Sequence, residues 1–477
     1  MTSSLNQQTK VVLWLSGNMI STFRRQTASF WTTVFEAEPI QQDQTILNDT
    51  IKDMIPSCQL PSTAKLLVVT TPRTSHFYML PKIHKPNNPG RPIVSACCCQ
   101  TENISVYLDK VMAPFVKQLL TYIKDTNHAI SIFESFSFTF NESYQRFCFL
   151  FIIDIKSQYT VISNDGGLQA PAYFLDQRTV KEPSTHTLVC LAELVLILNT
   201  FSFDDQHHRQ IGGVAMGSRM GSNYTYLFVG YIGGHICSMY TGFAPQLHNR
   251  YINDVVRAAQ CSLLELENFI NYVSNFYLAL QFPSNFSDLE PPSLDIKMKI
   301  NNHSKQMSVR CTETDTHNYL HHTSLHPDHC KQAIPYSQLL QLCHICLDND
   351  DFAAQATEMK AFFQARGYPE ALLNDYLCKI LTVSPNKVLT PPAERDSTES
   401  RVSLVLNYNQ FNTGTKLILL NTFKILLSNP ATDTIFPELP LVSYSRAALI
   451  LTLYQTNLLF LYFYLTVHFL SVNFPMD

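Results

Sequence analysis

The chain of 477 residues has few charged side chains, because Asp, Glu, Lys and Arg together make up only 15% of it. An average soluble domain has about a quarter. The formal net charge of −4 excludes a protein coated with basic residues, so any surface that binds nucleic acid must be local. Tryptophan is rare, with two residues, whereas Phe (31) and Tyr (22) are plentiful. This length leaves room for a large core and two or three domains.

Several sequence features of other protein classes are also missing. We find no internal repeat, no long low-complexity segment and no Walker or Rossmann glycine spacing. The 13 cysteines are odd in number and lack a framework spacing, which is typical of free thiols in a reducing compartment. The apolar run Val11–Leu15 is too short for a signal peptide. We therefore expect a nuclear or cytoplasmic protein.

Two segments about a hundred residues apart each bring a carboxylate to the end of a strand. Phe147–Asp154 is a continuous apolar run, typical of a strand buried on both faces. Arg250–Val256 predicts two strands joined by a tight turn, with Asn253 and Asp254 at its tip. Side by side in one sheet, the segments would place Asp154 and Asp254 at one edge. Two-metal phosphoryl transfer needs carboxylates that hold cations roughly 3.5–4 Å apart, although an Asp that ends a strand is also a common turn residue.

A basic stretch precedes these segments. Lys65–Lys124 contains eight Lys or Arg residues and two acidic ones, which is the charge balance of a phosphate-binding face. Inside it, an Asn-Asn-Pro-Gly tetrad separates two β-like runs and predicts a hairpin. The hairpin would present Lys82, Lys85 and Arg91 near its tip, where these cations could neutralise a triphosphate. A solvated basic turn would have the same pattern.

A glycine cluster and an aromatic residue complete the candidate site. Gly212–Gly221 holds four of the 14 glycines, with Ser218 beside Gly217, and such clustering lets the backbone approach a ligand closely. Tyr159 lies five residues after Asp154. Its ring could pack beneath an incoming sugar, or it could simply cover the sheet.

Local signals predict several other elements. Ser262 with Glu265 forms a capping-box pattern at the start of a helix. Alternating apolar residues predict a hairpin over 296–311. A helix is predicted from Asp351 to Arg366, stopped by Gly367 and Pro369.

Two stretches have open interpretations. His317–Cys346 contains several His and Cys residues, including one Cys-x-x-Cys, but zinc fingers need a second ligand pair at finger spacing. Ala447–Phe474 contains no charged residue and exceeds the ~20 residues that cross a bilayer. This tail is either a membrane anchor or a non-native extension of the chain.

The order of these segments resembles the reverse transcriptases of retroelements, most closely those of Penelope-like elements. Phe77–Val94 (FYMLPKIHKPNNPGRPIV) resembles the fingers, and Phe151–Thr160 resembles the first catalytic motif, Asp-Val-x-Ser-Leu-Tyr-Thr. Gly213–Gly221 is similar to the loop that contacts template and nucleotide. Arg250–Val256 resembles the Tyr-Ile-Asp-Asp hairpin. The resemblance extends from about residue 10 to about residue 445.

The resemblance implies an α+β fold, a right-hand polymerase with fingers, palm and thumb. The palm would have a βαββαβ-type sheet and the thumb would be helical. The implied divisions are an N-terminal extension (1–62), fingers (63–145), a palm with the catalytic motifs (146–310), a thumb or C-terminal helical region (311–445) and an apolar tail (446–477).

The implied activity is RNA-directed DNA polymerisation on an RNA or DNA template-primer with dNTPs. Asp154 and Asp254 would hold two Mg²⁺ ions, or Mn²⁺, with Asn253 at a degenerate catalytic position. Lys82, Lys85 and Arg91 would bind the triphosphate. The resemblance also places the nucleotide beside Tyr159, Gly217 and Ser218.

Departures from the family pattern predict impaired activity. Asn253 stands where the family has Asp, so one negative charge between the metal ions is missing. Gln158 replaces a Leu, Ser222 replaces a Pro, and no GIY-YIG endonuclease module is present. These features are typical of a decayed or truncated element. We expect a reverse transcriptase-like protein of low activity; the alternatives are a catalytically silent nucleic-acid-binding protein, or a membrane protein anchored through 447–474.

Overall fold

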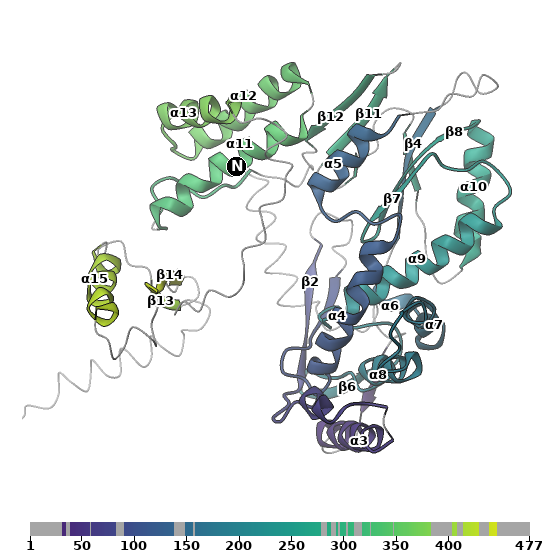
Figure 1. Ribbon diagram of the computed structural model, residues 1–477. Helices are drawn as coiled ribbons and strands as arrows, with labels where there is room; N and C mark the ends of the chain where they lie inside the picture. Colours follow the sequence, from purple (N-terminus) through teal and green to yellow (C-terminus); the bar gives the residue numbers. More distant parts are fainter. Residues whose placement is uncertain are drawn as a thin grey trace, which may run out of the picture. The chain divides into compact units, whose positions relative to one another are not determined.

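The computed structural model (Figure 1) divides the chain into two compact units. The first is Met1–Asp315 with Ile345–Asp348, and the second is Thr316–His344 with Asn349–Asp477. Within them, the structure describes residues 31–34, 39–57, 59–82, 90–137, 148–155, 158–277, 284–287, 292–293, 296–301, 304–309, 317–324, 326–346, 348–382, 403–407, 414–428 and 438–445. The fold class is α+β, and the five-part division of the chain stays a prediction.

A five-stranded sheet in the first unit contains the predicted basic hairpin. Its strands, in spatial order β1-β6-β5-β2-β3, are β1 (Trp31–Val34), β6 (Gln206–Gln210), β5 (Thr200–Phe203), β2 (Ser75–Pro81) and β3 (Gly90–Ser95). β2 and β3 pair antiparallel from His76 opposite Ser95 to Pro81 opposite Gly90. The predicted pairing of the two β-like runs is therefore confirmed.

A second, four-stranded sheet carries the candidate carboxylates. It is antiparallel throughout, with the order β7-β8-β4-β9, and consists of β7 (Leu247–Tyr251), β8 (Asp254–Gln260), β4 (Cys148–Asp154) and β9 (Ser284–Ser287). A separate three-stranded sheet comprises β10 (Pro292–Ser293), β11 (Ile296–Asn301) and β12 (Ser304–Val309). Ile296 pairs with Val309 and Asn301 with Ser304, so the predicted second hairpin is confirmed.

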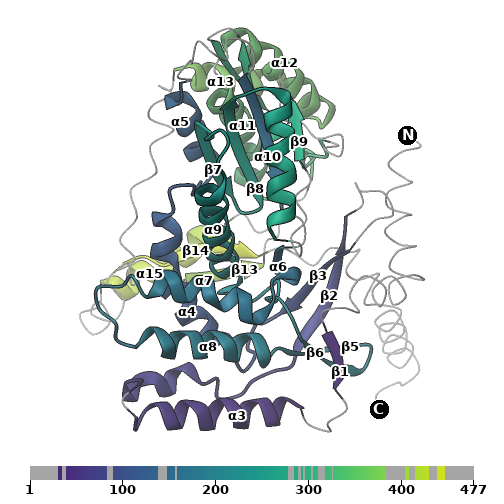
Figure 2. The same ribbon diagram turned by 90° about the vertical axis from the view of Figure 1, so that its right-hand side faces the viewer.

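Helices make up the rest of the first unit. They are α3 (Pro39–Met54), the 3₁₀ helix η1 (Ser62–Leu67), α4 (Glu102–Gln118), α5 (Thr126–Ser135), α6 (Gln158–Val161), α7 (Asn164–Leu175), α8 (Thr185–Ile197), α9 (Gly221–Met239) and α10 (Leu263–Phe276). In both Figure 1 and Figure 2, α7 and α8 lie between α3 and the four-stranded sheet. The capping box at the start of α10 is confirmed, because the Ser262 and Glu265 side chains each bond the other residue's backbone N–H.

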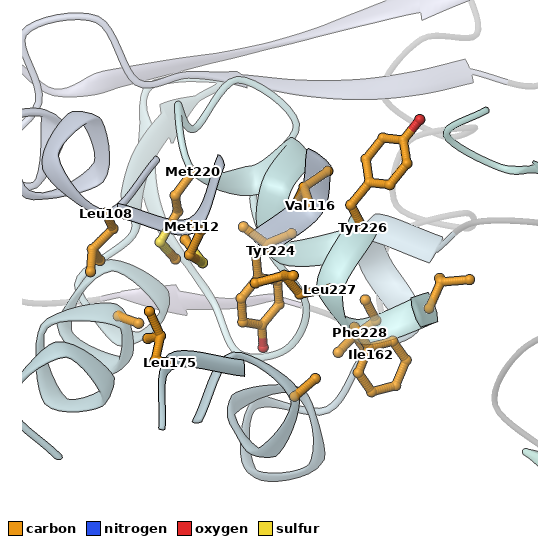
Figure 3. Packing of buried hydrophobic residues seen from close by; sticks show 14 of the residues in the cluster. Leu108, Met112, Val116, Ile162, Leu175, Met220, Tyr224, Tyr226, Leu227 and Phe228 are labelled. Atoms are coloured by element: carbon orange, nitrogen blue, oxygen red, sulfur yellow. The ribbon is translucent and has the colours of Figure 1, made fainter. Parts of the chain in front are cut away.

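The core of the first unit lies where α4, α7 and α9 meet. The buried apolar residues of α4 recur every fourth position, at Ile104, Leu108, Met112 and Val116, so they form one ridge along the helix. Figure 3 shows Leu108, Met112 and Val116 of this ridge beside buried residues of α9, among them Tyr224. Burying each such side chain contributes about 1.5–3 kcal/mol. This packing supports the sheet and the loop described below.

The second unit is mainly helical where it is described. It contains α11 (Asp328–Ile345), α12 (Asn349–Ala365), α13 (Glu370–Leu381), α15 (Thr415–Leu427), and the parallel pair β13 (Ser403–Asn407) and β14 (Leu441–Ser445). α12 begins two residues before the predicted start at Asp351. Gly367 has φ +79°, the left-handed conformation that ends a helix, so the predicted stop is confirmed.

A buried carboxylate joins α3 to the five-stranded sheet. Asp43 of α3 has no exposed surface, and its Oδ1 accepts a hydrogen bond from Arg209 Nη2 at 2.6 Å. Its Oδ2 accepts from Thr200 Oγ1 at 2.6 Å and from Gln100 Nε2 at 3.3 Å. Because a buried charge is tolerated only when it is paired and hydrogen-bonded, these contacts explain why an acidic residue can occupy this position.

We predict that Asp43→Ala lowers the free energy of unfolding by about 3 kcal/mol, because Arg209 and Thr200 lose their acceptor in a buried position. Urea denaturation followed by circular dichroism measures this change. The control is Asp49→Ala, since Asp49 lies on the exposed side of α3, 3.6 Å from Lys52, and should change stability by less than about 0.5 kcal/mol. Equal losses of stability in the two variants would show that the buried contacts of Asp43 do not stabilise the fold.

Candidate active site

β4 is a central strand whose composition matches its surroundings. Phe149, Leu150, Phe151, Ile152 and Ile153 are all at most 7% exposed, and β8 and β9 pair with the two edges of the strand. A strand enclosed in this way has no solvated face, which is why its sequence does not alternate. The predicted buried strand ending at Asp154 is therefore confirmed.

The register of β4 on β8 places Asp154 and Asp254 opposite each other in the backbone pairing. Residues pair from Cys148 opposite Gln260 to Asp154 opposite Asp254. Directly opposed residues in an antiparallel pair have Cα atoms about 4.5–5.5 Å apart. Asp254 is half-buried, and its Oδ1 accepts a hydrogen bond from Asn253 Nδ2 at 3.3 Å. The predicted juxtaposition of Asp154 and Asp254 is thus present in the sheet.

The turn between β7 and β8 differs by one residue from the prediction. Tyr251 pairs with Asp254, so Ile252 and Asn253 form the tip, and Asp254 is the first residue of β8. The sequence expectation of Asn253 and Asp254 at the tip is wrong in this respect. Ile252 has φ +52°, a conformation that a β-branched residue rarely adopts. Such strain persists only where surrounding contacts enforce it.

Arg250 supplies those contacts from inside the fold. Its side chain is 3% exposed, and it donates hydrogen bonds to the Ile252 carbonyl at 3.0 Å and the Tyr226 carbonyl at 2.6 Å. The guanidinium also lies over the Tyr226 ring, 4.4 Å from its centroid. Burial lowers the pKa of Arg250 to about 10, so the group remains charged at neutral pH.

The backbone of the turn is held by two further hydrogen bonds. Ile252 N–H donates to the Tyr226 hydroxyl at 2.5 Å, and burial raises the pKa of Tyr226, so this hydroxyl stays protonated. Ile155 N–H donates to the Asn253 carbonyl at 3.0 Å, which ties the tip to the residue that follows Asp154. The hairpin is therefore fastened both to α9 and to the end of β4.

The glycine loop contacts the protein's own backbone. Gly213 and Gly217 have φ +74° and +136°, and an added Cβ at these positions would collide with the carbonyl oxygens of Tyr159 and Val94. Val94 N–H donates to the Met216 carbonyl at 3.1 Å. The loop therefore joins β3 to α6, and the close approach expected of these glycines is used by the chain itself.

Two predicted nucleotide-contacting residues belong to the same region. Ser218 Oγ lies 2.8 Å from Ser105 Oγ of α4, and Tyr159 O accepts a hydrogen bond from Val214 N–H at 2.8 Å. Tyr159 is half-buried and packs against the main core. Roles for Gly217, Ser218 and Tyr159 in nucleotide binding stay predictions.

Two of the three predicted cations, Lys82 and Arg91, lie at the described ends of the β2–β3 pair. Arg91 is exposed and pairs with Leu80, and Lys82 is half-buried directly after β2. Lys85 falls outside the described residues. Since Gly217 touches Val94 of β3, the hairpin and the glycine loop adjoin each other.

Few of the described side chains could bind a metal ion. Among the described residues, no group of three or more His, Cys, Asp or Glu side chains is arranged to hold a metal ion, and this includes the described part of 317–346. Mg²⁺, however, is usually bound by one or two protein carboxylates, with water and substrate phosphates as the remaining ligands. Asp154 and Asp254, opposed in the backbone register, meet that requirement in number, and their role as metal ligands stays a prediction.

No helix within the described ranges is long and apolar enough to cross a membrane. The uncharged tail at 447–474 lies outside those ranges, so both predictions for it, a membrane anchor and a non-native extension, stay open.

A model of one protein family matches part of the second unit. It is the animal helix-turn-helix domain, and it covers residues 318–377, which include α11, α12 and most of α13. No curated protein matches the chain.

Solved polymerase structures share low similarity with the chain. Telomerase from Candida albicans, in complex with a fragment of telomeric RNA, is 9% identical with a TM-score of 0.44, over 77% of this chain and 68% of that one. Apo telomerase from Candida tropicalis is 9% identical, with a TM-score of 0.41, over 78% of this chain and 68% of that one. The RNA-dependent RNA polymerase of a sicinivirus is 10% identical, with a TM-score of 0.42 over 74% of each chain. All three TM-scores lie below 0.5.

We predict that Tyr226→Phe loosens the hairpin, because the Ile252 N–H loses its acceptor, at a cost of about 1–2 kcal/mol. Hydrogen–deuterium exchange of a peptide spanning 247–260 should become faster. Tyr173→Phe is the matched control, since Tyr173 is 55% exposed, and it should leave that peptide unchanged. Unaltered exchange in Tyr226→Phe would show that this hydrogen bond does not hold the turn.

Proposed function

We propose that this protein is a reverse transcriptase-like, template-directed nucleotidyl transferase of retroelement origin, whose activity is reduced by Asn253. The observation that carries the proposal is the register pair Asp154 and Asp254 beside a two-residue turn. The motif order along the chain supports the same activity. The proposed substrates are a template-primer and dNTPs.

The proposed metal ligands are Asp154 and Asp254. A divalent cation bound by them would activate the attacking hydroxyl and stabilise charge on the reacting phosphates. The two residues are close in register, and Asp254 is half-buried rather than fully solvated. Incomplete solvation strengthens the electrostatic attraction between a carboxylate and a cation.

Asn253 weakens this site in two ways. Its amide is neutral, so the turn supplies one negative charge fewer than two adjacent aspartates would. In addition, its Nδ2 donates to Asp254 Oδ1 at 3.3 Å, and this hydrogen bond occupies part of the oxygen's capacity to bind a cation. Both effects lower the affinity of the pair for divalent metal ions.

The proposed triphosphate contacts come from the β2–β3 hairpin. Arg91 is exposed, and its planar guanidinium suits bidentate phosphate contacts. Lys82 and Lys85 would add point charges, and the glycine loop beside β3 would border the same nucleotide. The basic surplus of 65–124 supplies the positive field that attracts the template.

The helix-turn-helix segment is less suited to reading nucleic acid. α12 and α13 are joined by four residues that include Gly367, as in helix-turn-helix motifs generally. However, α13 carries Glu370 and Asp375, and its one cation, Lys379, pairs with Asp375 at 2.6 Å. Positive charge near the phosphates favours binding to nucleic acid, and α13 has more acidic than basic residues. We therefore assign template binding to the first unit.

We predict that Asn253→Asp raises primer extension on an RNA template by about 100-fold, the range expected for restoring one group that stabilises transition-state charge. Asp254→Asn should abolish extension. Rates are measured with purified protein in Mg²⁺ and in Mn²⁺.

The matched control for added charge is Asn271→Asp, because Asn271 is exposed on α10, away from the turn. It should extend primers at the rate of the unchanged protein. If the unchanged protein is as active as Asn253→Asp, the proposed impairment is wrong. If every variant is folded but inactive, the proposed polymerase activity is wrong.

A further inference from the structure

A cavity lies on the helix side of the four-stranded sheet. Its volume is about 580 Å³, and its wall is formed by β4, β7, β8, α7, α9, α10 and the segment after α4. The volume is within the range of about 300–1,000 Å³ usual for small-molecule sites. Val255 and Arg257 of β8 line this cavity, whereas Asp254, one residue away, belongs to the other face of the strand.

Arg257 is buried in the cavity wall with hydrogen-bond donors unused. Its side chain is 3% exposed, and its guanidinium lies over the Phe269 ring, 4.8 Å from the centroid. Nη2 is 3.1 Å from His248 Nε2. Nε and Nη1 are buried and have no hydrogen-bond partner within the described structure. A buried donor without an acceptor is destabilising, and more so when it is charged.

The cavity wall has positive charge and no described counter-charge. Arg250 and Arg257 both line it, and none of its lining residues is Asp or Glu. Burial lowers the pKa of each arginine only to about 10, so both stay charged at neutral pH. Burial and the two arginines hold the pKa of His248 well below its usual value, so the imidazole is neutral and its Nε2 can accept from Arg257.

The guanidinium groups of Arg250 and Arg257 differ in how many of their N–H donors have an acceptor. Arg250 donates to two carbonyl oxygens, whereas Arg257 has one neutral partner and two unused donors. The site therefore lacks an anionic acceptor at Arg257. Much of the remaining wall is apolar, with Ile153, Val229 and Tyr231 among its members. A ligand that suits both features has one anionic group and an apolar body.

We propose that this cavity binds a small organic carboxylate, with the carboxylate against the Arg257 guanidinium and its apolar body along α9 and β4. Such a contact is a charge-assisted hydrogen bond, which is about twice as strong as a neutral one. This binding is separate from the proposed polymerase activity, because the cavity and Asp254 lie on opposite faces of the sheet.

The test compares decanoate with decanol, which has the same apolar body without the charge. Isothermal titration calorimetry of the full chain should give decanoate an affinity at least about tenfold higher than that of decanol, as expected for one hydrogen bond to a charged group. Arg257→Met should remove this preference and leave decanol binding unchanged. Arg73→Met is the matched control, since Arg73 is exposed and does not line the cavity.

A second measurement locates the ligand in the unmodified protein. Cys237 lines the cavity and is exposed, with its Sγ 3.6 Å from His248 Nδ1. Decanoate should slow maleimide alkylation of Cys237, read by mass spectrometry, and should not slow that of the exposed Cys378 on α13. Equal affinity for decanoate and decanol, undiminished preference in Arg257→Met, or unprotected Cys237 would each overturn the proposal.

Discussion

Seven consecutive residues of β4 pair with seven of β8, and this register determines which residues are opposed at the edge of the sheet. A shift by one residue would turn every side chain of a strand to the opposite face. Asp154 and Asp254 would then no longer be opposed, and the apolar residues packed under α9 and α10 would lose their partners. The burial of Phe151 and Val255 therefore stabilises the same register that places Asp154 opposite Asp254.

The hairpin depends in turn on a buried cation. Arg250 holds the Ile252 carbonyl from within the fold, and Tyr226 accepts the N–H of the same residue. These contacts keep Ile252 in a conformation that isoleucine alone would avoid. Because Arg250 also lines the cavity behind the sheet, the turn and the cavity share one side chain. The candidate site is thus supported from the face opposite Asp254.

Features with local signals were predictable from the sequence. The apolar run of β4, the capping box at Ser262 and the hairpin around the Asn-Asn-Pro-Gly tetrad each depend on neighbouring residues. The exact turn residues were not predictable, because Arg250–Val256 contains two adjacent polar residues and either could begin the second strand. The glycines at 213 and 217 indicated a close approach but not that Tyr159 and Val94 are the partners.

Contacts between distant residues had no sequence signal. Arg250 and Tyr226 are 24 positions apart, and Asp43 and Arg209 are 166 apart. Such pairs depend on how helices and sheets pack, which a pattern of apolar residues does not specify. The same is true of Arg257, which occupies a strand position otherwise typical of an apolar residue.

We propose that Asp154 and Asp254 together hold a divalent cation, and metal-directed cleavage tests this directly. Fe²⁺ substituted for Mg²⁺, with ascorbate and peroxide, cleaves a polypeptide next to the bound metal ion, and mass spectrometry of the fragments maps the cuts. A cation held by these two residues should give paired cuts near residues 154 and 254, both lost in Asp254→Asn. Cuts confined to other regions, such as the Cys and His residues of 317–346, or cuts that persist in Asp254→Asn, would contradict it.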